Sequence, residues 1–267
     1  MLRKLQMTTK KTQPDQAVLS ERPLNMKGHE LFAARTRDLI DSLDWQPWVS
    51  TSFLTPAEQQ LLEKLAGSLH VEFSGGYPGA ERKLAVLSEL PEDVDFSECF
   101  VCLKSPLSPE DPVPEHRHVL GALMHLGLER EVIGDIVIDR DAVHVFVLSH
   151  MADFVKDSCT RAGKSSLHFE ISDTTDLKGI ELLPIRINVS SLRLDAVVAA
   201  LAHCSRSSAM DKIRTGDVKL NDVQVVQNDT LCHNDHVSIR RCGRFLMNGI
   251  VSSTRKQRLV LEFLQYA

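Results

Sequence analysis

In the C-terminal part of the chain, hydrophobic residues repeat with the period of a helix. Four apolar side chains occupy the i, i+3, i+4 and i+7 positions of one helix face, at Leu194, Val197, Val198 and Leu201. We expect Ser191 to cap this helix. A second helix is predicted to begin at Ser205 and to bury Ala209, Met210 and Ile213. It should end at Gly216, because glycine tolerates the left-handed backbone conformation.

The period then changes to the alternation that is typical of β-strands. Val218 to Leu220 alternate, and Asn221-Asp222 offers the two residues of a tight turn. Alternation resumes from Val223 to Val225 and appears again from Val237 to Ile239. This end of the chain therefore predicts two helices followed by a hairpin and a further strand.

The earlier part of the chain mixes helical and extended patterns. Helices are predicted over Leu31–Leu43, Pro56–Ala66, Val119–Leu126 and Met151–Arg161, with Thr55 as the cap of the second. Strands are predicted over Val71–Phe73, Cys99–Leu103, Ile136–Ile138 and Val143–Leu148. Separate helices and strands of this kind predict an α+β fold.

Charge separates the two ends of the chain. The formal net charge of the whole chain is −5. Residues 185–267 carry 12 Lys and Arg against 7 Asp and Glu, or +5, whereas residues 1–184 carry 19 against 29, or −10. The distribution indicates that contact with a polyanion is confined to the C-terminal end and a few local basic spots.

The start of the second C-terminal helix is the strongest candidate for a phosphate site. A helix N-terminus presents free backbone N–H groups and about half a positive charge, and Arg206 lies beside it, between Ser205 and Ser207. The other candidate contacts of this end are Arg193, Lys212, Arg214, Lys219, Arg240, Arg241 and Arg244. A merely solvated basic face is the alternative interpretation.

The order of these elements resembles the S4 RNA-binding domain, a helix-helix-hairpin module. The resemblance rests on Leu192-Arg193-Leu194-Asp195, on Ser205-Arg206-Ser207 and on the run from Ile213 to Asn221. It implies RNA binding, whereas Asp195 is expected to pair locally or to cap its helix. We expect residues 185–250 alone to bind RNA and the acidic remainder to add discrimination between RNAs.

Two other segments carry candidate RNA contacts. GGYPGAERK, from Gly75 to Lys83, matches neither GxGxxG nor GxxxxGK[ST], so no nucleotide site is predicted there. Its Arg82 and Lys83 are candidates if the turn borders an RNA-facing or interdomain surface, and a purely structural turn is the alternative. Arg117, between His116 and His118, either contacts RNA or is solvated.

Four segments in order extend the resemblance: GGYPGAERK, HRHVLGALMHLGLEREVIGDI, VFVLSHMADF and SSLRLDAVVAA. Over roughly residues 50–262 the chain is similar to the YlmH family of bacterial S4-domain proteins. The resemblance implies a helical N-terminal region (29–84), a central RRM-like α+β domain (85–182) and an S4 domain with a C-terminal strand extension (183–267), after a flexible basic tail (1–28). The family has His-Arg-Asp where this chain has His116-Arg117-His118, so no family role is transferred to the central residues.

The same resemblance implies a role in ribosome-associated quality control. The implied partners are rRNA of the large ribosomal subunit, tRNA or peptidyl-tRNA, and a factor that adds a C-terminal tail to the stalled nascent chain. Six cysteines without a paired framework indicate a reducing compartment, so we expect a cytoplasmic protein, and a monomer.

No metal site, cofactor or membrane partner is predicted. Cys99 and Cys102 form a CxxC, but the group of Cys232-His233, His236 and Cys242 begins 130 residues after Cys102, whereas a four-ligand zinc site usually needs two closely spaced pairs. No segment approaches the ~20 apolar residues of a membrane span. Residues 1–28 lack the apolar core of a secretory signal, which leaves a disordered tail or an organellar presequence.

An RNA-modifying enzyme is the competing hypothesis, because S4 domains are often appended to pseudouridine synthases and rRNA methyltransferases. The Asp expected of a pseudouridine synthase is missing beside Arg117, and no glycine-rich strand-helix turn is present to hold S-adenosylmethionine. No catalytic residue is therefore predicted. The sequence favours a non-catalytic RNA-binding ribosome factor, with an rRNA or tRNA pseudouridine synthase or methyltransferase, or a protein adaptor, as alternatives.

Overall fold

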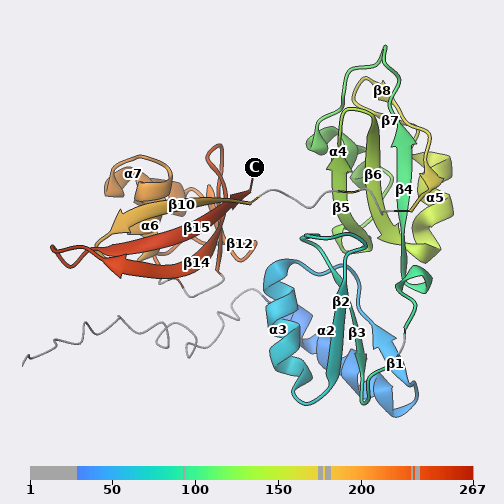
Figure 1. Ribbon diagram of the computed structural model, residues 1–267, viewed down its shortest axis with the longest axis horizontal. Helices are drawn as coiled ribbons and strands as arrows, with labels where there is room; N and C mark the ends of the chain where they lie inside the picture. The colour runs from blue at the N-terminus through green and yellow to red at the C-terminus, as the bar shows by residue number, and fades with distance from the viewer. Residues whose placement is uncertain are drawn as a thin grey trace, which may run out of the picture. The chain divides into compact units, whose positions relative to one another are not determined.

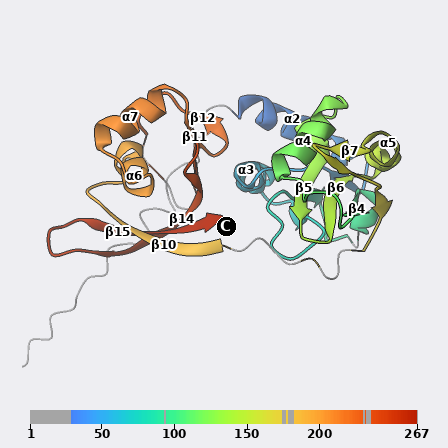
Figure 2. The same ribbon diagram turned by 90° about the horizontal axis from the view of Figure 1, so that it is seen from above.

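The computed structural model describes residues 29–266 except 93, 174–176, 178–181, 230 and 232–234. The described residues form two compact units, one within Met26–Glu181 and one within Leu182–Ala267 (Figures 1 and 2). Both units combine helices with antiparallel sheets, which confirms the α+β class. The predicted tail over 1–28 lies outside the described residues. None of the described helices combines the length and the apolar character needed to cross a membrane.

The first unit begins with two helices packed on a three-stranded antiparallel sheet of order β1-β3-β2. Its elements are α2 (Glu30–Asp41), the 3-10 helix η1 (Ser42–Asp44), β1 (Trp48–Ser50), α3 (Pro56–Ala66), β2 (His70–Ser74) and β3 (Leu84–Ser88). Both predicted helices are confirmed, and Thr55 caps α3 through a capping box with Glu58. The sequence analysis missed β1 and β3, so the region predicted as helical also contains a sheet.

A second sheet of order β5-β6-β4-β9 follows, with α4 and α5 on one face (Figure 2). The elements of this part are η2 (Phe96–Glu98), β4 (Phe100–Pro106), α4 (His116–His125), η3 (Arg130–Val132), β5 (Ile133–Ile138), β6 (Ala142–Leu148), η4 (Ser149–Met151), α5 (Ala152–Ser158), β7 (Arg161–Ala162), β8 (Ser165–Ser166) and β9 (Glu170–Ile171). The predicted strands and helices are confirmed here, although α5 ends before the predicted Arg161. Val145 and Val147 of β6 share one core with Val119 of α4 and Val155 of α5.

The opposite face of this second sheet packs against the N-terminal part of the same unit. The ring of Tyr77 stacks on Phe146 of β6 with centroids 5.1 Å apart, and Phe53 meets the edge of Phe100 of β4 at 5.3 Å. All four rings are buried in one apolar cluster. The two sheets of the first unit are therefore joined by an aromatic core.

The glycine-rich loop from Gly75 to Lys83 is part of this junction. Gly76 has φ +85°, and a Cβ added there would lie 2.5 Å from Cε1 of Phe146. Asp135 of β5 accepts hydrogen bonds from the Tyr77 hydroxyl (2.8 Å) and from the backbone N–H of Glu81 (2.7 Å) and Arg82 (3.0 Å). The contacts favour the structural interpretation of this turn.

The second unit is a six-stranded antiparallel sheet of order β10-β15-β14-β13-β11-β12, with α6 and α7 on one face (Figures 1 and 2). Its elements are β10 (Leu182–Val189), α6 (Leu194–Leu201), α7 (Arg206–Arg214), β11 (Val218–Leu220), β12 (Val223–Gln224), β13 (His236–Ile239), β14 (Gly243–Ser253) and β15 (Leu259–Tyr266). Its core joins Val197 of α6 and Ile213 of α7 to Phe245, Met247 and Phe263 of the sheet.

The predicted order of helices and strands in this unit is confirmed. Gly216 adopts φ +78°, and both residues of the Asn221-Asp222 turn have positive φ, as a two-residue hairpin of the I′ type requires. The predicted cap of α6 is wrong, because Arg193 rather than Ser191 holds the N-cap position and makes no side-chain cap. The first backbone N–H groups of α6 instead donate to the carbonyl oxygen of Asp229 and the side chain of Asn228.

Candidate nucleic-acid interface

A buried carboxylate organises the start of both helices in the second unit. Asp195, in the first turn of α6, has a side chain only 5% exposed. Its Oδ1 accepts hydrogen bonds from Nε of Arg193 (3.2 Å) and Nδ2 of Asn228 (2.8 Å), and its Oδ2 accepts from Nε of Arg206 (3.0 Å) and from the Nη2 of the same guanidinium. The expected local pairing of Asp195 is confirmed.

The electrostatics of this cluster follow from its burial and its donors. Burial raises the pKa of Asp195, but hydrogen bonds from Arg206, Asn228 and Arg193 outweigh that effect and hold the pKa at about 2. Arg193 and Arg206 nevertheless keep side chains 57% and 51% exposed. The carboxylate therefore fixes two cations in place while part of each guanidinium faces solvent.

The start of α7 completes this end of the unit. Ser205 caps α7, and its Oγ accepts a hydrogen bond from the backbone N–H of Ser208 (3.2 Å). The hydroxyl groups of Ser205 and Ser207 lie 2.9 Å apart. The predicted trio of Ser205, Arg206 and Ser207 thus surrounds one helix N-terminus, where partial positive charge favours an anion.

The remaining predicted cations of this unit lie along α7 and on the strands that follow it. Lys212 and Arg214 occupy the last turn of α7, Lys219 is exposed on β11, and Arg241 is exposed in the turn after β13. Arg240 Nη1 lies 3.4 Å from Asp217 Oδ1. All of these side chains except Lys212 are exposed, so they remain accessible to a ligand.

Arg244 is placed differently from the other predicted cations. Its Nη2 lies 3.3 Å from Asp222 Oδ1, and its guanidinium carbon lies 5.2 Å from the ring centroid of Tyr266. The side chain is only 26% exposed. A structural cation–π and ion-pair contact therefore occupies much of its surface.

The three candidates in the first unit have different environments. The Arg82 side chain is buried, with an exposure of 8%, and donates hydrogen bonds to the backbone oxygens of Phe53 (2.7 Å) and Ile133 (3.1 Å). The prediction that Arg82 contacts RNA is therefore wrong for this conformation. Lys83 is half-buried, whereas Arg117 is exposed at the start of α4 and pairs with Glu115 at 2.8 Å.

The aromatic face of the second sheet, β5-β6-β4-β9, is not accessible to RNA, and we call this sheet the central sheet below. RRM-type domains stack RNA bases on exposed aromatic side chains of a four-stranded sheet. Phe100 and Phe146 point from β4 and β6 to one face, but Phe53 and Tyr77 cover them. RNA contact by this sheet would have to use another surface.

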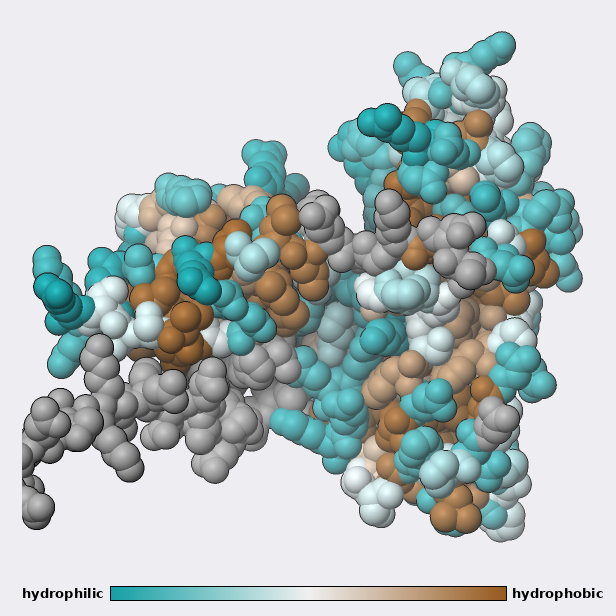
Figure 3. Space-filling view, viewed as in Figure 1, coloured by the Kyte–Doolittle hydropathy of each residue, from teal (hydrophilic) through white to brown (hydrophobic). Residues whose placement is uncertain are grey.

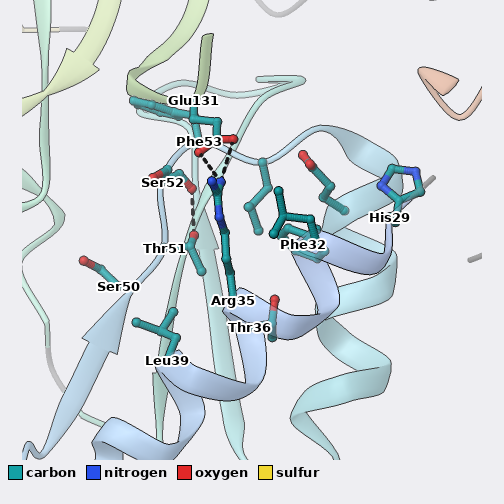
Figure 4. A pocket seen from close by; sticks show the side chains of 13 residues that line it. His29, Phe32, Arg35, Thr36, Leu39, Ser50, Thr51, Ser52, Phe53 and Glu131 are labelled. Atoms are coloured by element: carbon teal, nitrogen blue, oxygen red, sulfur yellow. Dashed lines mark hydrogen bonds and ion pairs between the residues drawn. The ribbon is translucent and has the colours of Figure 1, made fainter. Parts of the chain in front are cut away.

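A groove of about 380 Å³ lies between α2 and the segment from β1 to the start of α3 (Figure 4). Arg35 reaches across it, with its Nη1 3.1 Å from Oε1 of Glu131. Phe32 and Leu39 add apolar lining. None of the predicted RNA contacts lines this groove, and the charge of Arg35 is matched by Glu131, so the groove offers no phosphate site.

A cysteine of β4, a histidine of β6 and an aspartate of the turn between β5 and β6 lie in a row. Cys102 Sγ lies 3.9 Å from Nδ1 of His144, whose Nε2 lies 3.6 Å from Oδ2 of Asp139. Burial raises the pKa of Cys102 to about 12 and lowers the pKa of His144. Because the thiol stays protonated and both side chains are buried, these residues do not meet the requirements of a cysteine nucleophile and its base.

No three His, Cys, Asp or Glu side chains gather as a metal site would require within the described part of the chain. Cys232 and His233, which belong to the second cysteine–histidine group of the sequence, lie outside the described residues.

The sequence analysis missed two features of the second unit. It missed Asn228 as a hydrogen-bond partner of Asp195, and it missed three cations between β14 and β15, at Arg255, Lys256 and Arg258. The three cations carry a signal in the sequence, a basic run without an acidic neighbour.

Comparison with known proteins adds a second line of evidence. Residues 91–176, which contain β4 to β9, match a family model described as "Putative RNA-binding domain in YlmH". The ribosome-associated protein quality control protein P2 of Bacillus subtilis (strain 168) is 36% identical over 253 residues, which cover 88% of this chain and 97% of that protein. A solved structure of the cell division protein ylmH from Streptococcus pneumoniae is 20% identical, covers 55% of this chain and 92% of its own, and has a TM-score of 0.48, too low to add weight. On the strength of the Bacillus relative, the chain belongs to the YlmH family.

Proposed function

We propose that the chain is a non-catalytic RNA-binding factor that acts on the ribosome, and that residues 182–267 are its S4 module. One observation carries the proposal. Asp195 holds Arg193 and Arg206 beside the N-terminus of α7, so two cations and a helix dipole present positive charge at one place. A preorganised site of this kind suits the phosphates of structured RNA, because little side-chain entropy is lost on binding.

The finer role follows from the family. The Bacillus relative is named for ribosome-associated protein quality control. We infer that this chain binds the large ribosomal subunit that still carries peptidyl-tRNA, and that it contacts both rRNA and tRNA there. It then supports the factor that adds a C-terminal tail to the stalled nascent chain. We also propose that the protein is a monomer and acts in the cytoplasm. In the first unit, Arg117 of an RRM-like domain and Lys83 of the preceding glycine-rich loop contribute RNA contacts.

Charge reversal in the second unit tests the proposal. Lysates with and without induced translational stalling are sedimented through sucrose gradients, and the wild-type chain is expected with large subunits after stalling. Arg206→Glu combined with Lys212→Glu should move the chain to the free fraction, because two favourable phosphate contacts become repulsive. The reversal Arg37→Glu with Lys64→Glu changes net charge equally at exposed positions of α2 and α3, and it should leave sedimentation unchanged.

Two results would overturn the proposal. The first is a wild-type chain that stays free of large subunits after stalling. The second is the same loss of sedimentation in both double variants, which would reduce the effect to net charge. Mass spectrometry of rRNA and tRNA tests the non-catalytic part, since a modified nucleotide that disappears when the gene is deleted would establish an enzyme.

A further inference from the structure

The connection between β14 and β15 projects from the second unit as a basic hairpin tip, which we define as Thr254–Arg258. Figures 1 and 2 show this connection extending beyond the neighbouring strands and helices, and Figure 3 shows strongly hydrophilic residues at its end. Arg255, Lys256, Gln257 and Arg258 are all exposed. The tip therefore presents three cations and no acid.

The tip is a defined turn. The backbone N–H of Thr254 donates to the carbonyl of Arg258 (2.8 Å), and the N–H of Gln257 donates to the carbonyl of Thr254 (2.9 Å). Gln257 takes φ +58°, and the hydroxyl of Thr254 accepts from the N–H of Arg258 (3.1 Å). A closed turn fixes the backbone from which the Arg255 and Lys256 side chains project.

The charge of the tip is less compensated than that of five of the predicted RNA contacts. Arg193, Arg206, Arg214, Arg240 and Arg244 each have a carboxylate partner. Arg255 and Lys256 form no ion pair with any residue in the described part of the chain. Residues 243–261 contain four Lys and Arg and no Asp or Glu. The tip thus adds a local positive field that the surrounding protein does not cancel.

The tip lies at the end of the unit that carries Arg193. Nη2 of Arg258 donates to the carbonyl oxygen of Asn188, near the end of β10 (2.7 Å). Arg193 follows Asn188 by five residues, a chain length that spans at most about 17 Å. Arg193 and the base of the hairpin tip therefore lie at the same end of the unit.

We propose that Arg255 and Lys256 form a second phosphate-contacting site, which binds the backbone of an RNA helix held by Arg193 and Arg206. The inference rests on the proposed function, because it adds contacts to the same RNA. An anionic membrane is the less suitable partner, since the tip lacks the apolar residues that anchor a segment in a bilayer interface.

Binding of the full-length chain to a 20-base-pair RNA duplex across a salt series tests the site. Arg255→Gln with Lys256→Gln should reduce the slope of log affinity against log salt by about 2, one for each contact. The affinity deficit should be roughly tenfold larger at 50 mM than at 200 mM salt. Arg258 is left in place because it holds the tip on β10.

Two control variants separate the site from general charge. Arg255→Lys with Lys256→Arg preserves both charges and should keep the wild-type slope. Arg37→Gln with Lys64→Gln removes two exposed cations of the first unit and should also keep it. A slope that is unchanged in the tip double variant, or equally reduced in the Arg37 and Lys64 variant, would overturn the inference. The inference would also be overturned if the tip double variant lost binding to anionic vesicles but kept the wild-type binding to RNA. That result would assign the tip to membranes.

Failure of this inference is distinguishable from failure of the proposed function. In one case, the wild-type chain binds the duplex with a steeper salt slope than the tip double variant but never sediments with large subunits. This result would refute the ribosomal role and retain the site. A chain that sediments with large subunits, with the tip double variant matching the wild type in both assays, would remove the site and retain the ribosomal role.

Discussion

The charge of Asp195 should stabilise the second unit as well as position its arginines. Asp195→Asn keeps the size of the side chain and removes the charge that attracts Arg193 and Arg206. The two guanidinium groups are half-exposed, so water can solvate them when the carboxylate is lost. The cost of the substitution is therefore the lost attraction, without the larger penalty of a buried, unpaired charge.

The pKa sets the magnitude and the pH range of this effect. The folded unit holds the pKa of Asp195 at about 2, against an ordinary 3.8. A lowered carboxyl pKa stabilises the fold above the unfolded value, by about 2 kcal/mol here, and the contribution is lost as pH falls from 3.8 through 2. Asp195→Asn should thus lower the free energy of unfolding by about 2 kcal/mol at pH 7 and by less than about 0.5 kcal/mol at pH 2.

Hydrogen exchange of the α6 and α7 amides measures the free energy of unfolding of the second unit separately from that of the first. Both tryptophans, Trp45 and Trp48, lie in the first unit, so their fluorescence in urea provides an internal control that should not change. Asp211→Asn removes an exposed carboxylate 4.0 Å from Arg214, and it should cost less than about 0.5 kcal/mol. Equal costs for the two substitutions, or an Asp195→Asn effect that persists undiminished at pH 2, would refute the electrostatic explanation.

Three other substitutions test the packing and the buried polar groups. Gly76→Ala should lower the free energy of unfolding of the first unit by about 3 kcal/mol in urea, because a Cβ at φ +85° would overlap Phe146. Arg82→Gln should cost about 2 kcal/mol there, since its charged hydrogen bonds are buried, while the salt slope of RNA binding stays unchanged. Burial, and then Arg244, lower the pKa of His236 to about 4 from 6.5, so the folded second unit binds fewer protons than the unfolded one. Hydrogen exchange should therefore show stability falling as pH decreases from 6.5 towards 4, by up to about 3 kcal/mol, and His236→Gln should remove most of this slope.

The helices and the short hairpin of the second unit were predictable because local chemistry specifies them. Ser205 supplies a cap, Gly216 supplies a positive φ, and Asn221-Asp222 supplies a two-residue turn. Each signal lies within a few residues of the element that it defines. The wrong cap at Ser191 has the opposite cause, because Asn228 and Asp229, more than 30 residues away, satisfy the start of α6.

The aromatic junction could not be predicted from local patterns. β3 reads LAVLS with every residue buried, so it lacks the alternation that identifies a half-buried strand. The burial of Arg82 depends on carbonyl oxygens of Phe53 and Ile133, which are distant in the sequence. A basic residue in a glycine-rich loop is more often solvated, and only the fold shows that this one is enclosed.

The strand order also corrects the limits of the RNA-binding fragment. The sequence analysis suggested residues 185–250, but β15 (Leu259–Tyr266) lies between β10 and β14 in the sheet. A chain that ends at residue 250 would lose the buried Leu261 and Phe263 and leave β10 without its partner. The fragment that retains the core therefore runs from residue 182 to residue 267.

The covered aromatic face constrains how the central sheet can contact RNA. The family model places an RNA-binding domain at residues 91–176, yet Phe100 and Phe146 lie beneath Phe53 and Tyr77. Base stacking on that face would require separation of the two sheets, which the hydrogen bonds of Asp135 to the glycine-rich loop oppose. Contacts from this domain should instead come from exposed side chains such as Arg117 and reach the RNA backbone, where they add affinity without base specificity.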